Sequence, residues 1–164
     1  FAKGLGDGHA IAGLAVTRSV AEQVKAAHGG ACNTFDTFSR GRDAIAAART
    51  VLEVAQREML YQNVHVRGVE FQANLAAVVV RYAGVVKRVV GIGGMTGLEF
   101  RDADMLARGM NLAPPSGIVV AKGGSPTYPV MRLPLQFDTP PEFVERVSGC
   151  VEDMLKAVQA KTGV

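Results

Sequence analysis

The sequence contains no tryptophan and only two cysteines, and its three tyrosines and seven phenylalanines are scattered. No run of Lys and Arg is longer than a pair, so the chain offers neither a base-stacking platform nor a basic stripe for nucleic acid. No apolar run approaches the roughly 18 residues that cross a bilayer; the most apolar stretch, residues 75–80, ends at Arg81. We therefore expect no nucleic-acid partner and no membrane partner.

The two cysteines, Cys32 and Cys150, lie far apart in the sequence, which favours free thiols in a reducing, intracellular compartment. Hydrophobic residues make up 48% of the chain, charged residues 20%, and the formal net charge is +3. This hydrophobic content excludes a disordered chain, which lacks the apolar surface to offset its conformational entropy. A length of 164 residues fits one domain and leaves little room for two.

Hydrophobic periodicity predicts helices and strands over most of the chain. Helices are expected over residues 19–27, 43–59, 69–83, 102–110 and from 139 onward, and strands over 10–17, 85–90, 95–100, 117–121 and 130–137. Ser19 and Asp43 are the expected N-caps of the first two helices, and residues 139–142 form a capping box. Two helices carry apolar stripes: Ile45, Ala48, Leu52, Ala55 and Met59 in one, and Val144, Val147, Val151, Leu155 and Val158 in the other.

Lys3 is the first candidate for chemistry. Gly4, Gly6 and Gly8 follow it, and glycines let the backbone approach a ligand closely. A lysine held there can form a Schiff base with an aldehyde when burial or a nearby charge depresses the pKa of its ammonium. A lysine beside glycines is also typical of a surface turn, so the residue types alone leave both interpretations open.

Residues 2–8, AKGLGDG, resemble the AKG-x-G-[ND]-G segment around the cofactor lysine of the class III pyridoxal-phosphate aminotransferases. Three further landmarks follow in the order of that family: FDTFSRGR at 35–42, VVGIGGMTGLE at 89–99 and MRLP at 131–134. Four landmarks in order are more specific than any one of them. The sequence most closely resembles the mitochondrial alanine–glyoxylate aminotransferase type of this family.

The resemblance implies a role for three residues. Lys3 matches the lysine that binds pyridoxal 5'-phosphate and then moves a proton at the substrate. Thr37 matches the threonine that holds the cofactor phosphate, in the family from the neighbouring subunit. Arg132 matches the arginine whose planar fork grips the substrate carboxylate. The implied substrates are an amino acid and a 2-oxo acid or aldehyde, and the implied full-length form is a homodimer.

The resemblance also implies an α/β fold, the C-terminal part of a fold-type I pyridoxal-phosphate-dependent transferase. Residues 1–50 would be the end of the large cofactor-binding domain, and residues 51–164 the small α+β domain, with antiparallel strands covered by helices. Because the chain opens at Phe1 inside a glycine-rich loop, we expect it to be the last part of a longer protein. The implied compartment is the mitochondrion or otherwise the cytoplasm.

Three features depart from the family pattern. The family's Gly-Gly-Asn-Pro is replaced by Ser39-Arg40-Gly41-Arg42, which leaves only Gly41 to take an unusual dihedral angle. Val90 stands where the family's V-R-G motif has arginine. The aspartate that keeps the cofactor ring nitrogen protonated precedes the lysine in the family and so is not in this chain. We therefore expect the chain to be inactive on its own.

Two other hypotheses remain. The chain can be a non-catalytic remnant that pairs with a related full-length subunit, or an unrelated phosphate-binding module that uses the glycine-rich segments 4–8 and 91–97. The second segment lies between two predicted strands instead of between a strand and a helix, which disfavours a nucleotide loop. The three histidines, His9, His28 and His65, lack metal-ligand spacing.

Overall fold

The computed structural model describes residues 3–29 and 41–162. It divides into two compact units, Phe1–Glu58 and Met59–Val164. The division falls between two helices, whereas the predicted boundary after residue 50 lies inside the first of them. That residue 50 separates a large from a small domain stays a prediction.

The first unit contains a 3-10 turn and two helices: η1 (Lys3–Gly6), α1 (Arg18–Ala27) and α2 (Arg42–Arg57). Thr17 caps α1, because its hydroxyl accepts a hydrogen bond from the Val20 backbone N–H at 3.4 Å; the predicted cap, Ser19, is wrong. Gly41 is the N-cap of α2, and Asp43 lies in its first turn instead. The φ of Gly41 is −63°, so the expected unusual dihedral angle is absent there.

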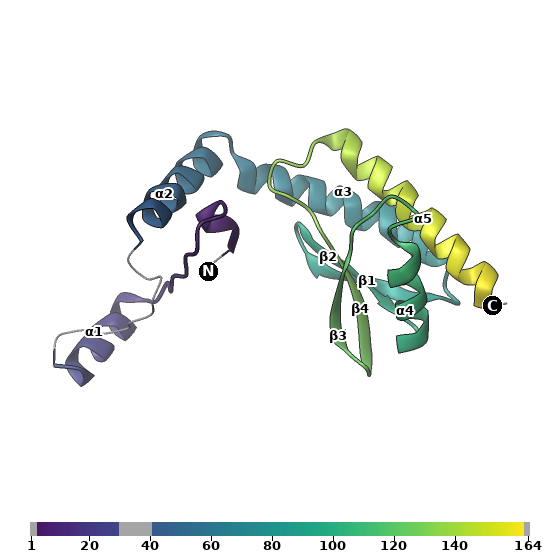
Figure 1. The fold of residues 1–164 in the computed structure, drawn as a ribbon, viewed down its shortest axis with the longest axis horizontal. Coiled ribbons are helices and arrows are strands. Elements are labelled where there is room, and N and C mark those ends of the chain that lie inside the picture. Colours follow the sequence, from purple (N-terminus) through teal and green to yellow (C-terminus); the bar gives the residue numbers. More distant parts are fainter. Residues whose placement is uncertain (1–2, 30–40, 163–164) are drawn as a thin grey trace. The chain divides into compact units, whose positions relative to one another are not determined.

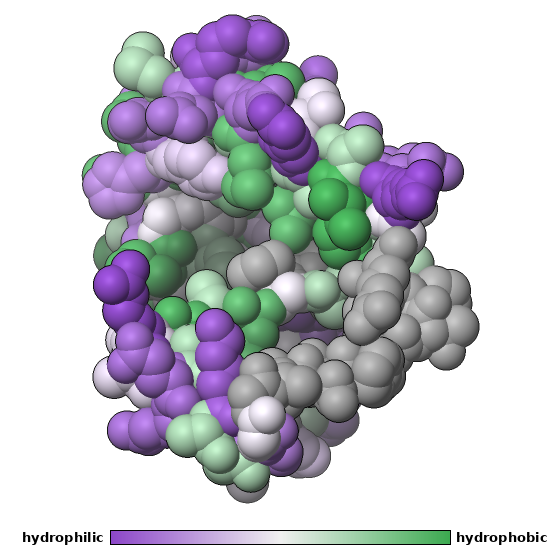
Figure 2. Space-filling view, turned by 90° about the vertical axis from the view of Figure 1, so that its left-hand side faces the viewer, coloured by the Kyte–Doolittle hydropathy of each residue, from purple (hydrophilic) through white to green (hydrophobic). Residues whose placement is uncertain are grey.

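Two predictions for this unit are wrong. Residues 10–17 form no strand apart from an isolated β-bridge at Ala12, and Leu14 is 85% exposed. A strand needs a hydrogen-bonded neighbour, and no strand occurs among the described residues of this unit. The stripe on α2 is only partly buried: Ala48 and Ala55 are covered, whereas Ile45 and Leu52 are about half exposed. Figure 2 accordingly shows hydrophobic side chains at the surface of the viewed face, beside hydrophilic ones.

The second unit contains three helices and four strands: α3 (Leu60–Arg81), β1 (Val86–Ile92), β2 (Met95–Phe100), α4 (Ala103–Leu112), β3 (Ala121–Ser125), β4 (Tyr128–Pro134) and α5 (Pro141–Thr162). The sheet is antiparallel throughout, with strand order β1-β2-β4-β3. In Figure 1, α3 and α5 lie side by side and α4 lies next to the sheet. This confirms the predicted α+β arrangement of antiparallel strands covered by helices.

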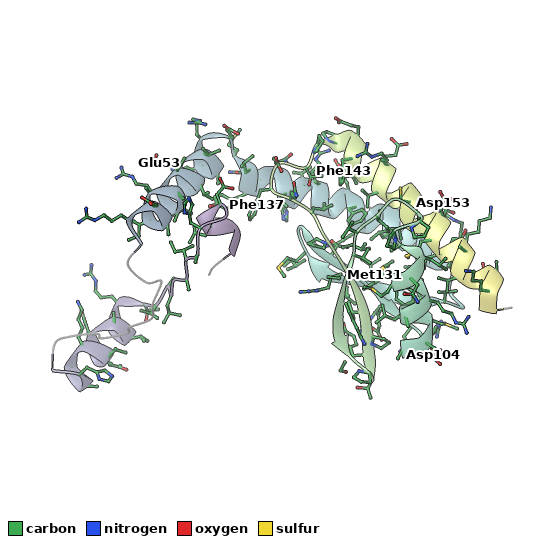
Figure 3. The ribbon with its side chains drawn as sticks, viewed as in Figure 1. Glu53, Asp104, Met131, Phe137, Phe143 and Asp153 are labelled. Atoms are coloured by element: carbon green, nitrogen blue, oxygen red, sulfur yellow. The ribbon has the colours of Figure 1, made fainter. Side chains whose placement is uncertain are left out.

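The core of this unit lies between the sheet and the helices. Met131 of β4 is fully buried on the side of the sheet that faces α4, where a Cβ at Gly109 would come within 3.1 Å of its Cε (Figure 3). The predicted stripe on α5 is confirmed: four of its members are almost fully buried and one is half-buried, namely Val144, Val151, Leu155 and Val158, and Val147. Its period of three to four residues identified the buried face correctly.

Some boundaries in this unit differ from prediction. Helix α3 begins at Leu60, nine residues before the predicted start, directly after Met59 with φ +52°. The strand predicted at 117–121 is wrong, because Gly117 has φ +84° and donates to the carbonyl of Pro114, which continues the turn at the end of α4. Strand β3 instead begins at Ala121 and contains Gly123 and Gly124, the second with φ +71°.

The predicted capping box at 139–142 is also not formed as expected. The Thr139 hydroxyl donates to the carbonyl of Gln136 at 2.8 Å, and α5 begins at Pro141. Proline is well tolerated there, because the first turn of a helix leaves backbone amides without intrahelical acceptors. Among the described residues, no helix has both the length and the apolar character to span a membrane.

Candidate active site

Lys3 begins η1, a turn that contacts α2. The turn is held by two backbone hydrogen bonds, from Asp7 N–H to the Gly4 carbonyl at 3.3 Å and from His9 N–H to the Gly6 carbonyl at 2.9 Å. Asp7 and Gly8 both have positive φ, +43° and +90°. The local sequence therefore folds as a tight turn that begins at Lys3, and the small buried residues of α2 (Ala44, Ala48 and Ala55) let a backbone approach that helix.

Arg132 lies in β4, exposed on the face of the sheet opposite the helices. It pairs with Gly97 of β2 on one side and Ala121 of β3 on the other. Its stem passes over Gly123, where an added Cβ would lie 2.9 Å from Cγ and 3.1 Å from Cδ of Arg132. No carboxylate within the described part of the chain pairs with Arg132. Its guanidinium is therefore available to an anion from outside.

A hollow of about 270 Å³ adjoins Arg132 on this face. Apolar side chains and glycines make up most of its lining, which includes Val90, Met95, Gly97, Ala121, Val130 and Pro134. Arg132 is the one charged residue among those that line it in the described structure. An arginine at the edge of an apolar hollow suits a small ligand with a carboxylate and an uncharged body.

The three predicted site residues are not all placed. Lys3 belongs to the first unit and Arg132 to the second, and Thr37 lies outside the described residues. The roles of Lys3, Thr37 and Arg132 therefore stay predictions.

An ionic cluster around one buried carboxylate on the same sheet face was not predicted. Glu99, only 6% exposed, accepts hydrogen bonds from Arg88 Nε at 2.7 Å and Lys87 Nζ at 3.1 Å. The register shifts between Val86 and Arg88, and this β-bulge lets two successive residues reach one carboxylate. The hydrogen bond from Arg88 lowers the pKa of Glu99 below its ordinary value, against the opposing effect of burial, and Lys87 lowers it further. The adjacent Lys-Arg pair was the only sequence signal, and it does not predict a bulge.

The glycine-rich segment 91–97 serves packing. It forms the end of β1, the turn and the start of β2, so the hypothesis of a nucleotide loop fails. Gln72 of α3 donates to the Gly93 carbonyl at 3.1 Å and lies 3.2 Å from the Thr96 hydroxyl oxygen. A Cβ at Gly94 would overlap Val64 of α3. The glycines thus let the hairpin approach the helix. The hypothesis of an unrelated phosphate-binding module therefore has no free loop at 91–97.

The chain matches the family of class-III aminotransferases over residues 1–147. It belongs to that family. Two curated relatives are acetylornithine aminotransferases: one from Prochlorococcus marinus, 30% identical over 129 residues, and one from Parasynechococcus marenigrum, 35% identical over 98 residues. These matches cover 73% and 60% of this chain, but only 30% and 22% of the relatives. The matched part of the chain thus spans less than a third of the length of these two curated relatives.

Solved transaminases share the fold. A transaminase from the marine bacterium Virgibacillus superposes with a TM-score of 0.85 at 18% identity, covering 99% of this chain and 39% of that one. The predicted fold class, the C-terminal part of a fold-type I pyridoxal-phosphate-dependent transferase, is confirmed. At this identity the likeness shows the fold alone.

Pyridoxal phosphate is the cofactor of this family. The part of the described chain that bears on its attachment is the turn that begins at Lys3. A Cβ at Gly4 would meet no atom within 4 Å apart from its chain neighbours, so the turn is not packed against other residues at that position. A lysine in the chain beside this residue supplies the kind of amine that attaches an aldehyde covalently. The chemistry of the chain's own residues therefore fits the group at Lys3.

Proposed function

We propose that this chain is the C-terminal part of a pyridoxal-phosphate-dependent aminotransferase that moves an amino group between an amino acid and a 2-oxo acid or aldehyde. The observation that carries the proposal is the placement of Arg132: exposed, without a carboxylate partner among the described residues, and beside an apolar hollow. Such an arginine binds a substrate carboxylate through two parallel hydrogen bonds. The family match gives this arrangement its chemical context.

In this proposal Lys3, Arg132 and Thr37 each have a defined role. Pyridoxal phosphate, when bound, supplies an aldehyde and an electron-withdrawing ring. Lys3 holds that group through its amine and afterwards moves a proton at the substrate Cα. Arg132 binds and orients the substrate carboxylate, which fixes the Cα–H bond in position. Thr37 is proposed to hold the cofactor phosphate, and in a homodimer it would act in the neighbouring subunit.

The finer identity belongs to this proposal as well. The sequence resemblance indicated the alanine–glyoxylate type, whereas both curated relatives described above are acetylornithine aminotransferases. We therefore assign the reaction class and an amino acid substrate with a free carboxylate, without choosing the amino donor. An intracellular location, mitochondrial or cytoplasmic, stays a prediction.

A cofactor titration tests the role of Lys3. The purified chain is titrated with pyridoxal phosphate, and the absorbance change that accompanies attachment to an amine is recorded. Lys3→Ala should abolish the saturable part of the change, and Lys25→Ala, which removes a lysine of α1, should leave it intact. Equal changes in both variants would show that Lys3 is not a selective attachment point and would favour a non-catalytic remnant.

A further inference from the structure

The hollow beside Arg132 is built from one row of residues across the sheet. Val90 of β1 pairs with Gly97 of β2, Gly97 pairs with Arg132 of β4, and Arg132 pairs with Ala121 of β3. Residues paired in this way share one face of an antiparallel sheet. Arg132 is therefore the only charged member of a row whose other three members carry small apolar side chains or none.

Gly97 forms the floor of the hollow. A Cβ at this position would lie 2.8 Å from the Met131 carbonyl oxygen and 3.0 Å from Val130 Cγ1, so no larger residue fits without displacement. The same Cβ would lie 3.4 Å from Val90 Cγ2. The Val90 side chain therefore leans toward β2, and it borders the hollow on the side opposite Arg132.

The nearest other charges do not line the hollow. Arg88 and Lys87 both direct a nitrogen to Glu99, in the next row of the sheet. The stem of Arg132 lies over Gly123 of β3, on the side away from β1. A ligand in the hollow would thus meet the cation of Arg132 at one end and the methyl groups of Val90 at the other.

From this arrangement we propose that Val90 and Gly97 form an uncharged subsite that selects substrates with one carboxylate and an aliphatic body over substrates with a carboxylate at each end. The inference rests on the proposed carboxylate-binding role of Arg132. A second carboxylate near Val90 would lose hydration without gaining a hydrogen-bond donor, and that loss weakens binding. Val90 stands where the matching family motif has arginine, so this chain lacks a cation at the end of the row.

The test compares hexanoate with adipate, which share a six-carbon chain and differ in the second carboxylate. Binding to the full ¹⁵N-labelled chain is followed through the amide resonance of Gly97. We expect hexanoate to bind more tightly than adipate. Val90→Arg should shift the ratio of the two affinities toward adipate by about fivefold, the upper range for an exposed ion pair.

Three further variants separate the possible failures. Val80→Arg adds the same charge at an exposed position of α3 and should leave the ratio unchanged. Val90→Lys should shift the ratio in the same direction, which covers the case in which Val90→Arg does not fold. Arg132→Gln should abolish binding of both acids.

Two results would overturn the inference in different ways. Binding of both acids that depends on Arg132, with an affinity ratio unaltered by Val90→Arg and Val90→Lys, would remove the specificity role and leave the proposed function standing. Binding that is absent, or unaffected by Arg132→Gln, would overturn both.

Discussion

Gly68 of α3 lies against the backbone of Gly93 in the turn between β1 and β2, with no space for a side chain between them. A Cβ at Gly68 would overlap the carbonyl group of Gly93. This contact, together with the hydrogen bond from Gln72 to the same carbonyl, fixes the hairpin on the helix. The hairpin in turn carries Gly97 and the row that contains Arg132.

Gly68→Ala should therefore destabilise the second unit. Overpacking at a site that cannot relax costs about 1–3 kcal/mol, and chemical denaturation would measure the loss. The matched control is Gly149→Ala in α5, where a Cβ meets no atom within 4 Å. There the helix preference of alanine should raise the free energy of unfolding by up to about 1 kcal/mol. Equal effects of the two substitutions would contradict the close contact.

Glu99 should make stability depend on acid. Its pKa is lowered in the folded chain, chiefly by the hydrogen bond from Arg88. Its contribution is therefore complete above the unfolded-state pKa of about 4.3 and is lost as the pH falls through the lowered folded-state value. Glu99→Gln should reduce the fall in unfolding free energy between pH 6 and pH 3. Both pH values lie about one unit or more from the unfolded-state pKa.

The control for this prediction is Glu145→Gln, which removes the same charge from an exposed position of α5. Urea denaturation at a series of pH values compares the two variants with the parent chain. If Glu99→Gln and Glu145→Gln gave the same pH profile, Glu99 would not be a source of the acid dependence of stability, and the prediction would be wrong.

Asp102 should stabilise α4 as its N-cap. Its Oδ1 accepts a hydrogen bond from the Met105 backbone N–H at 2.7 Å. Asp102→Ala leaves that amide without its acceptor and should cost about 1 kcal/mol. Asp102→Asn keeps an accepting oxygen and should cost a few tenths of that amount. Thermal unfolding ranks the variants, and an Asn variant as unstable as the Ala variant would refute the capping role.

Sequence patterns predicted elements whose own residues determine them. The stripe on α5 and the bounds of β2 follow from local periodicity, and both are as expected. The absence of a longer strand at 10–17 could not be predicted, because a strand depends on a neighbour that the local sequence does not specify. Strand β3 was predicted too early in the sequence, because glycines such as Gly123 and Gly124 are uncommon in strands, although this sheet accommodates both.

The candidate site shows the same division. Motif resemblance indicated Lys3, Thr37 and Arg132 because those residues stand at fixed places in linear patterns. The role of Val90 as a neighbour of Arg132 could not be predicted, since it depends on pairing across β2. The cluster around Glu99 depends on a bulge, which changes the direction of Lys87 relative to a regular strand.

The chain alone should not transfer amino groups. The resemblance to the family implies that the aspartate that keeps the cofactor ring nitrogen protonated precedes Lys3, and without it the ring withdraws electrons poorly. Incubation of the purified chain with pyridoxal phosphate, L-glutamate and pyruvate should yield no alanine above the level with free cofactor. Catalytic production of alanine that is lost in Lys3→Ala would contradict this expectation.

The account is tested most directly by trapping the cofactor on the chain. Borohydride reduction in the presence of pyridoxal phosphate is followed by peptide mass analysis, with Lys3→Ala and Lys25→Ala in parallel. The account predicts a single phosphopyridoxyl group on the peptide that contains Lys3, absent in Lys3→Ala and retained in Lys25→Ala. Label distributed evenly over the other lysines, or no label, would show that the chain does not present the family's reactive lysine.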